Sequence, residues 1–384
     1  MLSLRLCQTI TSSFGAQMRL RWDAKRGSYC LTEPYYIGIE TKIMRFYILL
    51  LLAIFMLEGC QSGFYQGPPS DHFNGVTFFN PGETQRRSIE DVFEQGIAIK
   101  QQPWPSKFSA EQDASIHQIH SSSNAIKITF INHSTVLIQT KKINILTDPI
   151  WSYRASPFSW IGPARMREPG IKFSELPPIH VVLISHNHYD HLDIPTLERL
   201  NKTFHPVFIV PLGNKNFLNG YKIYNVTELD WWQKFKINNT TITFLPSQHW
   251  STRWLTDINR TLWGSYGIDS DGEKIYFAGD TGYSTNFKII RSKWGEPDLS
   301  LLPIGAYEPR SLLQSVHLNP QDAIQAHNDL NSHYSMGIHF GTFQLSRESI
   351  EQPIKDLTIA RQRTHVSDDK FFILHEGENW FFPP

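Results

Sequence analysis

Cysteine is almost absent from this chain of 384 residues, and the three cysteines, Cys7, Cys30 and Cys60, all precede residue 61. The sequence beyond them can form no disulfide bond, so a metal site there must use histidine and aspartate rather than thiolate ligands. Charge of a single sign is lacking as well, because 36 Lys and Arg residues balance 36 Asp and Glu residues. We therefore expect no nucleic-acid partner, which would call for a basic surface.

A hydrophobic run long enough to span a membrane is not evident either. The apolar stretch from Phe46 to Leu57 is shorter than the roughly 20 residues that a spanning helix needs, but it suits a signal-peptide core. It resembles a bacterial lipoprotein signal, with Gly59 before a lipidated Cys60, although Glu58 departs from that pattern. We expect residues 1–60 to be an N-terminal extension, with Met44 as the true start, followed by a lipoprotein-like anchor at the bacterial cell envelope. A buried or membrane-dipping helix is the alternative.

Composition divides the rest of the chain into two parts. Residues 61–120 are rich in Gly, Pro, Ser and Gln, and we interpret them as a tether and peripheral lead-in. Residues 121–384 form the main folded domain, in which turn signals separate short β-rich runs. The predicted strands are 126–131, 136–140, 143–147, 181–185, 207–210, 240–245, 274–278, 299–303 and 337–340, and the clearest predicted helices are 194–201 and 320–328. This order favours an α/β fold with helices packed outside sheets.

A histidine-rich motif follows one of these runs. The apolar residues 181–184 are typical of a buried strand, and directly after them come His186, His188, Asp190 and His191. Side chains at positions 186 and 188 share a face when the backbone is extended. Imidazole nitrogen and carboxylate oxygen are zinc ligands, and a site with an open position is catalytic. The motif therefore predicts a metal site at a strand end, with a polar turn bonded to backbone or water as the alternative.

Three later residues of the same chemical type also follow predicted strands. His249 comes after the strand 240–245, and His339 lies near the end of the last predicted strand. Asp280 follows the strand 274–278 between two glycines, which let the backbone turn sharply around it. Strand ends are where a sheet presents functional groups in a shared cleft. Singly, either histidine is more typical of a structural residue, but together they complete the histidine-rich motif.

This set of ligand-type residues resembles that of the metallo-β-lactamase superfamily with a two-metal site. Flanking blocks are similar to the N-acyl-phosphatidylethanolamine-hydrolysing phospholipase D family, namely residues 130–136, 146–149, 154–157, 176–178, 229–232, 262–265 and 303–310. The resemblance runs from about residue 126 to the C-terminus. It implies that residues 121–384 form an αββα sandwich, in which two mixed sheets are flanked by helices.

The resemblance also implies a dinuclear zinc hydrolase with two ions per chain. Its ligands would be two sets joined by a bridging carboxylate: His186, His188 and His249; Asp190, His191 and His339; and Asp280 as the bridge. Two adjacent zinc ions can share a water and lower its pKa, and they can neutralise charge on a phosphate. Asp280 would then be catalytic as well, because it would orient that water.

Two further positions match substrate contacts of the family, Tyr189 and His317. His317 would be catalytic by donating a proton to a phosphate oxygen or to the leaving alcohol, and a helix-cap role is the alternative. The chain departs from the family pattern at Asn319, where the family has Asp, and at Asn132, where it tends to have Gly.

Several other roles stay open at this point. Asp148 and Asp193 either fix imidazole tautomers or cap a turn or a helix. An aromatic cluster either lines an acyl groove, inserts into a membrane interface or packs in the core: Trp151, Tyr153, Phe158 and Trp160.

The implied function is phospholipase D-type hydrolysis of N-acyl-phosphatidylethanolamine-like lipids to phosphatidate and an N-acylethanolamine. A phospholipid substrate and a membrane surface would be the partners, and the family is dimeric, which suggests a homodimer. One alternative is a lactonase or another metallo-hydrolase of the same fold, which would favour a small polar pocket. The other is an envelope lipoprotein with a non-catalytic metal site.

Overall fold

The computed structural model describes residues 9–11, 17–23, 28–31, 64–82, 104–105 and 126–382. The chain divides into two compact units, Met1–Gln61 and Ser62–Pro384. The first contains a three-stranded antiparallel sheet of β1 (Thr9–Thr11), β2 (Gln17–Asp23) and β3 (Ser28–Leu31). The apolar stretch 46–57 and Cys60 lie outside the described residues. Within the described ranges, no helix combines the length and the apolar character that crossing a bilayer requires.

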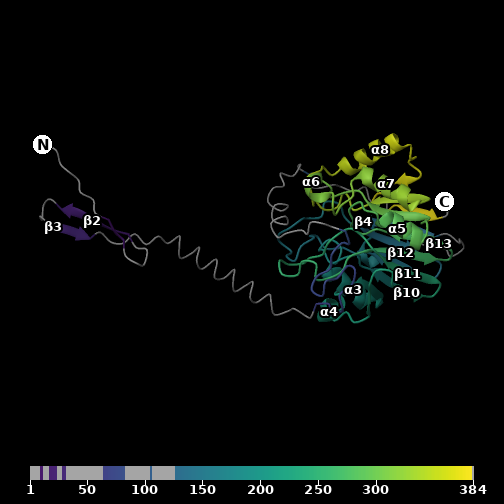
Figure 1. Ribbon diagram of the computed structural model, residues 1–384, viewed down its shortest axis with the longest axis horizontal. Helices are drawn as coiled ribbons and strands as arrows, with labels where there is room; N and C mark the ends of the chain where they lie inside the picture. The colour runs from purple at the N-terminus through teal and green to yellow at the C-terminus, as the bar shows by residue number, and fades with distance from the viewer. Residues whose placement is uncertain are drawn as a thin grey trace. The chain divides into compact units, whose positions relative to one another are not determined.

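Two seven-stranded sheets form the centre of the second unit (Figure 1). In order across the first sheet, the strands are β17 (Asn379–Phe382), β4 (Ile126–Asn132), β5 (Thr135–Gln139), β6 (Asn144–Thr147), β7 (Val181–Leu183), β8 (Val207–Pro211) and β9 (Val226–Leu229). Across the second, they are β10 (Lys234–Ile237), β11 (Thr240–Leu245), β12 (Ser265–Ser270), β13 (Glu273–Phe277), β14 (Leu299–Pro303), β15 (Tyr334–Ile338) and β16 (Phe371–Phe372). Both sheets are mixed, because each has antiparallel pairs at one edge and parallel pairs at the other.

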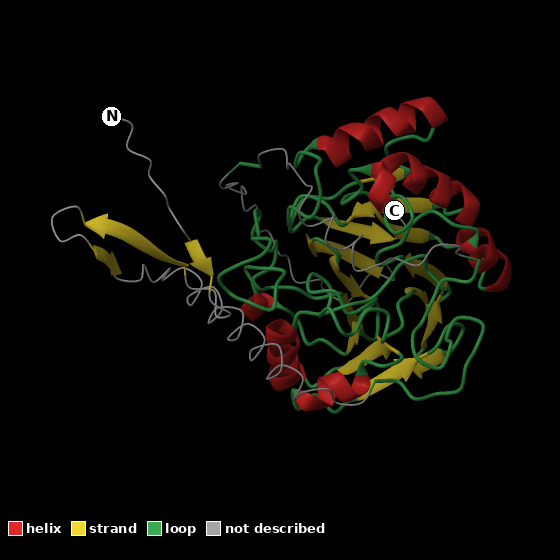
Figure 2. Cartoon of the chain, turned by 60° about the vertical axis from the view of Figure 1, so that its left-hand side comes forward, coloured by secondary structure: helices red, strands yellow, loops and turns green. Residues whose placement is uncertain are grey.

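Helices cover the outer faces of both sheets (Figure 2). On the first sheet, α3 (Ile194–Phe204) and α4 (Lys215–Gly220) bury leucines against Val182 and Phe208. On the second sheet lie α5 (Asn286–Lys293), α7 (Pro320–Leu330) and α8 (Gln352–Thr364), and the short α6 (Arg310–Leu313) precedes α7. A 3₁₀ turn (Phe173–Glu175) precedes β7. The layers are therefore helix, sheet, sheet and helix, which confirms the predicted αββα sandwich.

Strand β7 is buried on both of its faces. Val181 and Leu183 point into the core between the sheets, whereas Val182 and Ile184 join the core under α3. A strand that is covered on both sides needs apolar residues at successive positions rather than at alternate ones. This explains the continuous apolar run before the histidine-rich motif.

All nine predicted strands are present, and α3 and α7 begin at the predicted residues Ile194 and Pro320. Five strands of the second unit were not predicted: β9, β10, β12, β16 and β17. In β12 the pattern is obscured by Gly267, where a Cβ atom would lie 2.4 Å from the indole of Trp294. The packing of that indole requires a glycine, and glycine weakens a strand signal in the sequence.

Residues 64–82 differ from the peripheral lead-in that composition suggested. Phe73 and Phe78 are each only 1% exposed, and both belong to the core between the sheets. Their backbones form an antiparallel bridge around a turn that contains Gly75, whose φ of 92° favours glycine. The glycine and proline content of this segment thus reflects tight turns in a packed segment.

Candidate metal centre

The direction of the strands brings the predicted ligands together. β4, β6 and β7 run one way in the first sheet, and β11, β13, β14 and β15 share one direction in the second. Side chains that follow the carboxyl ends of such strands meet at the same edge of the sandwich. His186 and its neighbours follow β7, and the later residues follow β11, β13 and β15: His249, Asp280 and His339.

The first predicted ligand set forms one compact group. His186 Nε2 lies 2.8 Å from His188 Nδ1, and His249 Nε2 lies 3.3 Å from the same nitrogen. One nitrogen from each imidazole is therefore within 4.8 Å of the other two. His249 Nδ1 donates to the Val316 carbonyl over 2.9 Å, which directs Nε2 into the group.

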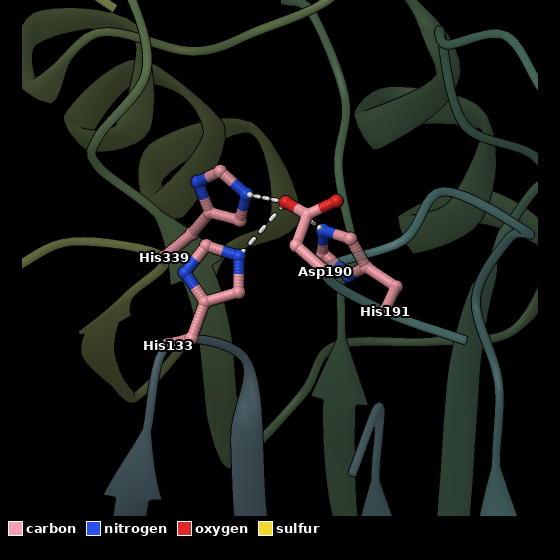
Figure 3. Close-up of side chains that lie close together, drawn as sticks. All are labelled: His133, Asp190, His191 and His339. Atoms are coloured by element: carbon pink, nitrogen blue, oxygen red, sulfur yellow. Dashed lines mark hydrogen bonds and ion pairs between the residues drawn. The ribbon is translucent and has the colours of Figure 1, made fainter. Parts of the chain in front are cut away.

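The second predicted set also comes together, with one addition (Figure 3). Asp190 Oδ2 lies 3.2 Å from His191 Nε2 and 3.5 Å from His339 Nε2. Asp280 Oδ2 lies between the two sets, 3.3 Å from His191 Nε2, 3.2 Å from His339 Nε2 and 3.9 Å from His249 Nε2. This central position is what a bridging carboxylate requires.

His133 is the addition, and it was missing from the predicted ligands. Its Nε2 lies 3.0 Å from Asp190 Oδ2, and its ring centroid lies 4.0 Å from that of His339. His133 follows β4, so it obeys the same strand-end rule as the other site residues. The sequence contains this signal, because His133 comes two positions after the end of the predicted strand 126–131, but in the sequence it is marked only by its place in a block similar to the family.

The backbone is strained at several turns of the centre. His133, Asp148 and His339 have φ values of 47°, 32° and 60°, a region that residues other than glycine rarely adopt. Such conformations cost about 1–3 kcal/mol each and persist where the surrounding structure enforces them. Before Asp280, the same need is met by Gly279 at φ 57°, where a Cβ atom would lie 2.4 Å from that of Ser185.

Electrostatics divides the buried histidines into two classes. Burial lowers the pKa of His186 and His249, and neighbouring imidazoles lower it further, so both are neutral. Burial also lowers the pKa of His191 and His339, but carboxylates led by Asp280 outweigh it and raise the pKa of His339 to about 9.

The two carboxylates are charged. Burial raises the pKa of Asp190 and Asp280, but the imidazoles around them, led by His191, outweigh it and hold both pKa values well below the ordinary range. The raised pKa values of His191 and His339 and the lowered pKa values of Asp190 and Asp280 thus have the same cause, the close approach of these imidazoles and carboxylates.

The donor set fits metal ions. In the described part of the chain, His191 Nε2, His339 Nε2 and Asp280 Oδ1 are buried and have no hydrogen-bond partner. Buried polar atoms are almost always satisfied, so a cluster of such atoms fits the binding of cations. Nitrogen and carboxylate oxygen without thiolate suit zinc and also other transition metals. His186, His188, Asp190, His191, His249, Asp280 and His339 are the residues that would hold the ions.

Asp148 and Asp193, whose roles were open, differ in what they contact. Asp148 Oδ2 lies 2.7 Å from His191 Nδ1, so it fixes the ring with Nε2 toward the centre. Asp148 also accepts from the backbone N–H and the hydroxyl of Ser185. Asp193 instead accepts from Ser152 and Thr196, and it contacts no imidazole in the hydrogen bonds of the described residues.

A cavity of about 560 Å³ opens above the centre. His188, Asp190, Asp280 and His317 lie in its lining together with apolar side chains. His317 Nδ1 is 3.8 Å from Asp280 Oδ2, and the N-cap of α7 is Asn319, so His317 does not cap that helix. Asn319 receives the Asp322 N–H in a capping box, a role that Asp would also fill.

Tyr189, which lies between His188 and Asp190 in the histidine-rich motif, also lines this cavity. Its hydroxyl donates to the Arg253 carbonyl over 2.9 Å, and the Arg253 guanidinium lies 4.0 Å from the centre of its ring. The structure thus brings both predicted substrate contacts, Tyr189 and His317, to the cavity.

Comparison with known proteins identifies this arrangement. A β-lactamase superfamily domain matches residues 143–340. N-acyl-phosphatidylethanolamine-hydrolyzing phospholipase D 1 of Caenorhabditis elegans is 37% identical over 274 residues, which cover 67% of this chain and 76% of that protein. The chain belongs to the N-acyl-phosphatidylethanolamine-hydrolysing phospholipase D family. The mitochondrial enzyme of that name from Saccharomyces cerevisiae is 36% identical over 222 residues, which cover 56% of this chain and 47% of that protein.

A solved structure shares the fold of this phospholipase D family member. A metallo hydrolase from the archaeon Ignicoccus hospitalis aligns with a TM-score of 0.50 at 18% identity, over 68% of this chain and 99% of that one. Fold, family and ligand chemistry agree: the chain is a metallo-hydrolase of the β-lactamase fold.

Proposed function

We propose that this chain is a phospholipase D-type phosphodiesterase that hydrolyses N-acyl-phosphatidylethanolamine-like lipids to phosphatidate and an N-acylethanolamine, with two zinc ions per chain. The observation that carries the proposal is the position of the metal centre at the floor of a cavity with apolar walls. The relatives from worm and yeast, which carry the name of this activity, support it.

The cavity walls favour a lipid over a small polar lactone. They are formed mainly by large apolar side chains: Trp250, Trp254, Leu255, Ile258, Leu313 and Leu345. Binding pockets for apolar ligands place a few polar groups among such side chains, and here the polar groups of the metal centre are joined by Thr252 and Arg253. An acyl chain can lie along the walls while a phosphodiester reaches the floor.

The chain's own residues would divide the work at the phosphodiester. Bound zinc ions supply positive charge at a phosphate and lower the pKa of a water. Asp280 would accept a hydrogen bond from the attacking water, which loses one proton to the solvent. The oxygen of that water would bond to phosphorus as the bond from phosphorus to the ethanolamine oxygen breaks. His317 gives its proton to that leaving oxygen. Arg310 donates to the His317 carbonyl over 2.9 Å and so holds this loop in place.

The decisive experiment supplies zinc-loaded protein with N-acyl-phosphatidylethanolamine in water enriched in ¹⁸O. Mass spectrometry should find the label in phosphatidate and none in the N-acylethanolamine, because the water oxygen ends on phosphorus. Asp280→Ala should lower turnover by more than about 100-fold, since even partners behind the ligands typically contribute 10–100-fold. Asp368→Ala, at an exposed position, is the control. Wild-type turnover no faster than that of Asp280→Ala would refute the proposal.

Contact with a membrane surface is part of this proposal, because the substrate resides in a bilayer. Exposed aromatic side chains support it: Tyr153, Phe158 and Trp160 lie in the same loop as Ala155 and Pro157, which line the cavity. We also propose a homodimer and an envelope anchor at Cys60, which sedimentation analysis and mass spectrometry of the mature protein would test.

A further inference from the structure

We propose that Asn80 is a positioning residue for the metal ligand His249, which makes the segment of residues 64–82 a working part of the metal centre. This segment precedes the matched β-lactamase superfamily domain by some sixty residues of sequence. The inference rests on the proposed metal site, but it does not depend on the identity of the substrate.

The part of the segment that precedes Asn80 is fixed by packing and by hydrogen bonds. Phe73 and Phe78 pack against each other with ring centroids 4.6 Å apart inside the core. His72 stacks on Trp231 at 4.3 Å and bonds to Asp230 through Nε2 at 2.7 Å. These contacts place the backbone of the segment before Asn80 within narrow limits.

The Asn80 side chain forms two hydrogen bonds with the main chain of His249. Its Nδ2 donates to the His249 carbonyl over 2.9 Å, and its Oδ1 accepts from the His249 N–H at 3.3 Å. The Trp263 indole N–H donates to the same Oδ1 over 3.0 Å. Asn80 is only 5% exposed, so water cannot readily replace these bonds.

These hydrogen bonds help to position His249 because it lies beyond the end of β11, where its backbone no longer pairs with a neighbouring strand. The imidazole is fixed at Nδ1 by the Val316 carbonyl, so its direction is set. The position of its Cα atom depends on main-chain bonds: those from Asn80 at His249 itself, and those from Thr281 and Gly282 at the preceding Gln248. Together the two constraints place Nε2 near His188 and Asp280.

The same segment also closes the loop that follows His249. The Phe78 N–H donates to the Asn259 carbonyl over 2.8 Å. Asn259 in turn donates its N–H to the Ser251 carbonyl at 2.7 Å, and its side chain accepts from the Ser251 N–H at 3.1 Å. The cavity wall between these residues is thereby joined to the segment that carries Asn80.

A side-chain amide is required for this role. The His249 N–H needs an acceptor and its carbonyl needs a donor, and an asparagine amide offers both on separate atoms, Oδ1 and Nδ2. Asn80→Leu keeps the volume and removes both bonds to His249, together with the bond from Trp263, whose indole N–H also donates to the Ser247 carbonyl. Asn80→Asp keeps the acceptor and loses the donor, and it serves if the leucine variant does not fold.

The test is a titration of metal-free protein with Co²⁺, followed by its visible absorption. Wild type should bind two ions, and Asn80→Leu should weaken one of the two steps by about tenfold or more, with a changed spectrum for that step. The other step should stay within about twofold of wild type. Asn80→Asp should show the same selective loss.

Asn74→Ala is the matched control. Asn74 lies in the same segment and is exposed, and its Oδ1 accepts from the N–H groups of Val76 and Thr77 without contacting His249. The inference is overturned if both Asn80 variants bind two ions like wild type, or if Asn74→Ala weakens Co²⁺ binding as much as they do. If the wild-type protein binds no Co²⁺, the proposed function is rejected as well. If the wild-type protein binds two ions and the Asn80 variants bind them equally well, only the inference about Asn80 is rejected.

Discussion

At the scale of single residues, the contact between His133 and Asp190 constrains the metal centre most directly. Burial and the neighbouring His339 lower the pKa of His133 to about 3, so its imidazole is neutral. Asp190 is ionised, so His133 must carry its proton on Nε2 and donate it to the carboxylate. The His133 carbonyl accepts from the His339 N–H over 2.8 Å, which ties this one residue to two predicted ligands.

We therefore expect His133→Asn to weaken zinc binding by about 10–100-fold, as the loss of an outer partner typically does. Asparagine tolerates the positive φ at this position but cannot reach Asp190, so the variant isolates the side-chain contact. A competition titration with a zinc chelator measures the change. His205→Asn is the control, since His205 is exposed and has a similar φ of 51°. Equal zinc affinity in the two variants would contradict this role.

At the scale of elements, the loop between β6 and β7 packs one of its aromatic side chains against the core and exposes others to solvent. Trp151 packs against the core under α3, with its indole N–H donating to the Ile171 carbonyl at 3.0 Å. The buried guanidinium of Arg165 holds the other end of the loop through the Ile150 carbonyl at 2.9 Å. Between these anchors Trp160 is 72% exposed, with its ring 5.5 Å from that of Phe158.

If this loop contacts a bilayer, Trp160→Ser should reduce binding to phospholipid vesicles several-fold, because transfer of an aromatic ring from water to the membrane interface is favourable. Hydrolysis of a short-chain soluble substrate should be unchanged, because Trp160 is not among the cavity-lining residues. Vesicle co-sedimentation measures the first effect. Tyr224→Ser, an exposed aromatic position beyond α4, is the control. Vesicle binding that matches wild type would exclude this loop as the contact.

At the scale of the whole molecule, His72 joins distant parts of the chain through an ionic contact. Burial lowers its pKa, but hydrogen bonds to Asp230 and Asp71 outweigh this and leave the pKa raised above 6.5. A raised pKa in the folded state means that the protonated form is stabilised by folding. The stabilisation is complete below the unfolded-state pKa of about 6.5 and is lost as the pH rises through the folded-state pKa.

His72→Gln should accordingly lower the thermal unfolding midpoint more at pH 6 than at pH 9. Differential scanning fluorimetry of the metal-free proteins across this range measures the difference. Asn74→Ala, which changes the same segment without removing a titratable group, should show no such dependence. A midpoint difference that is constant with pH would contradict the prediction.

Much of this molecule follows from local patterns in the sequence. Apolar runs bounded by turns located strands such as β7 and β14, and Pro320 marked the start of α7. The elements that escaped prediction are those whose pattern depends on a partner, as β12 does where Gly267 accommodates Trp294. The ligand-type residues could be found because each follows a strand, and strand ends are where such side chains are presented.

The sequence by itself located most of the residues that the structure gathers at the candidate metal centre, because histidine and aspartate at strand ends can be identified without a structure. Only the tertiary structure decided how they are held. His133 meets Asp190 across 57 positions of sequence, and Asn80 meets His249 across 169. Contacts at such separations leave no local periodicity, since they arise only when the folded chain brings remote turns to one edge of the sandwich.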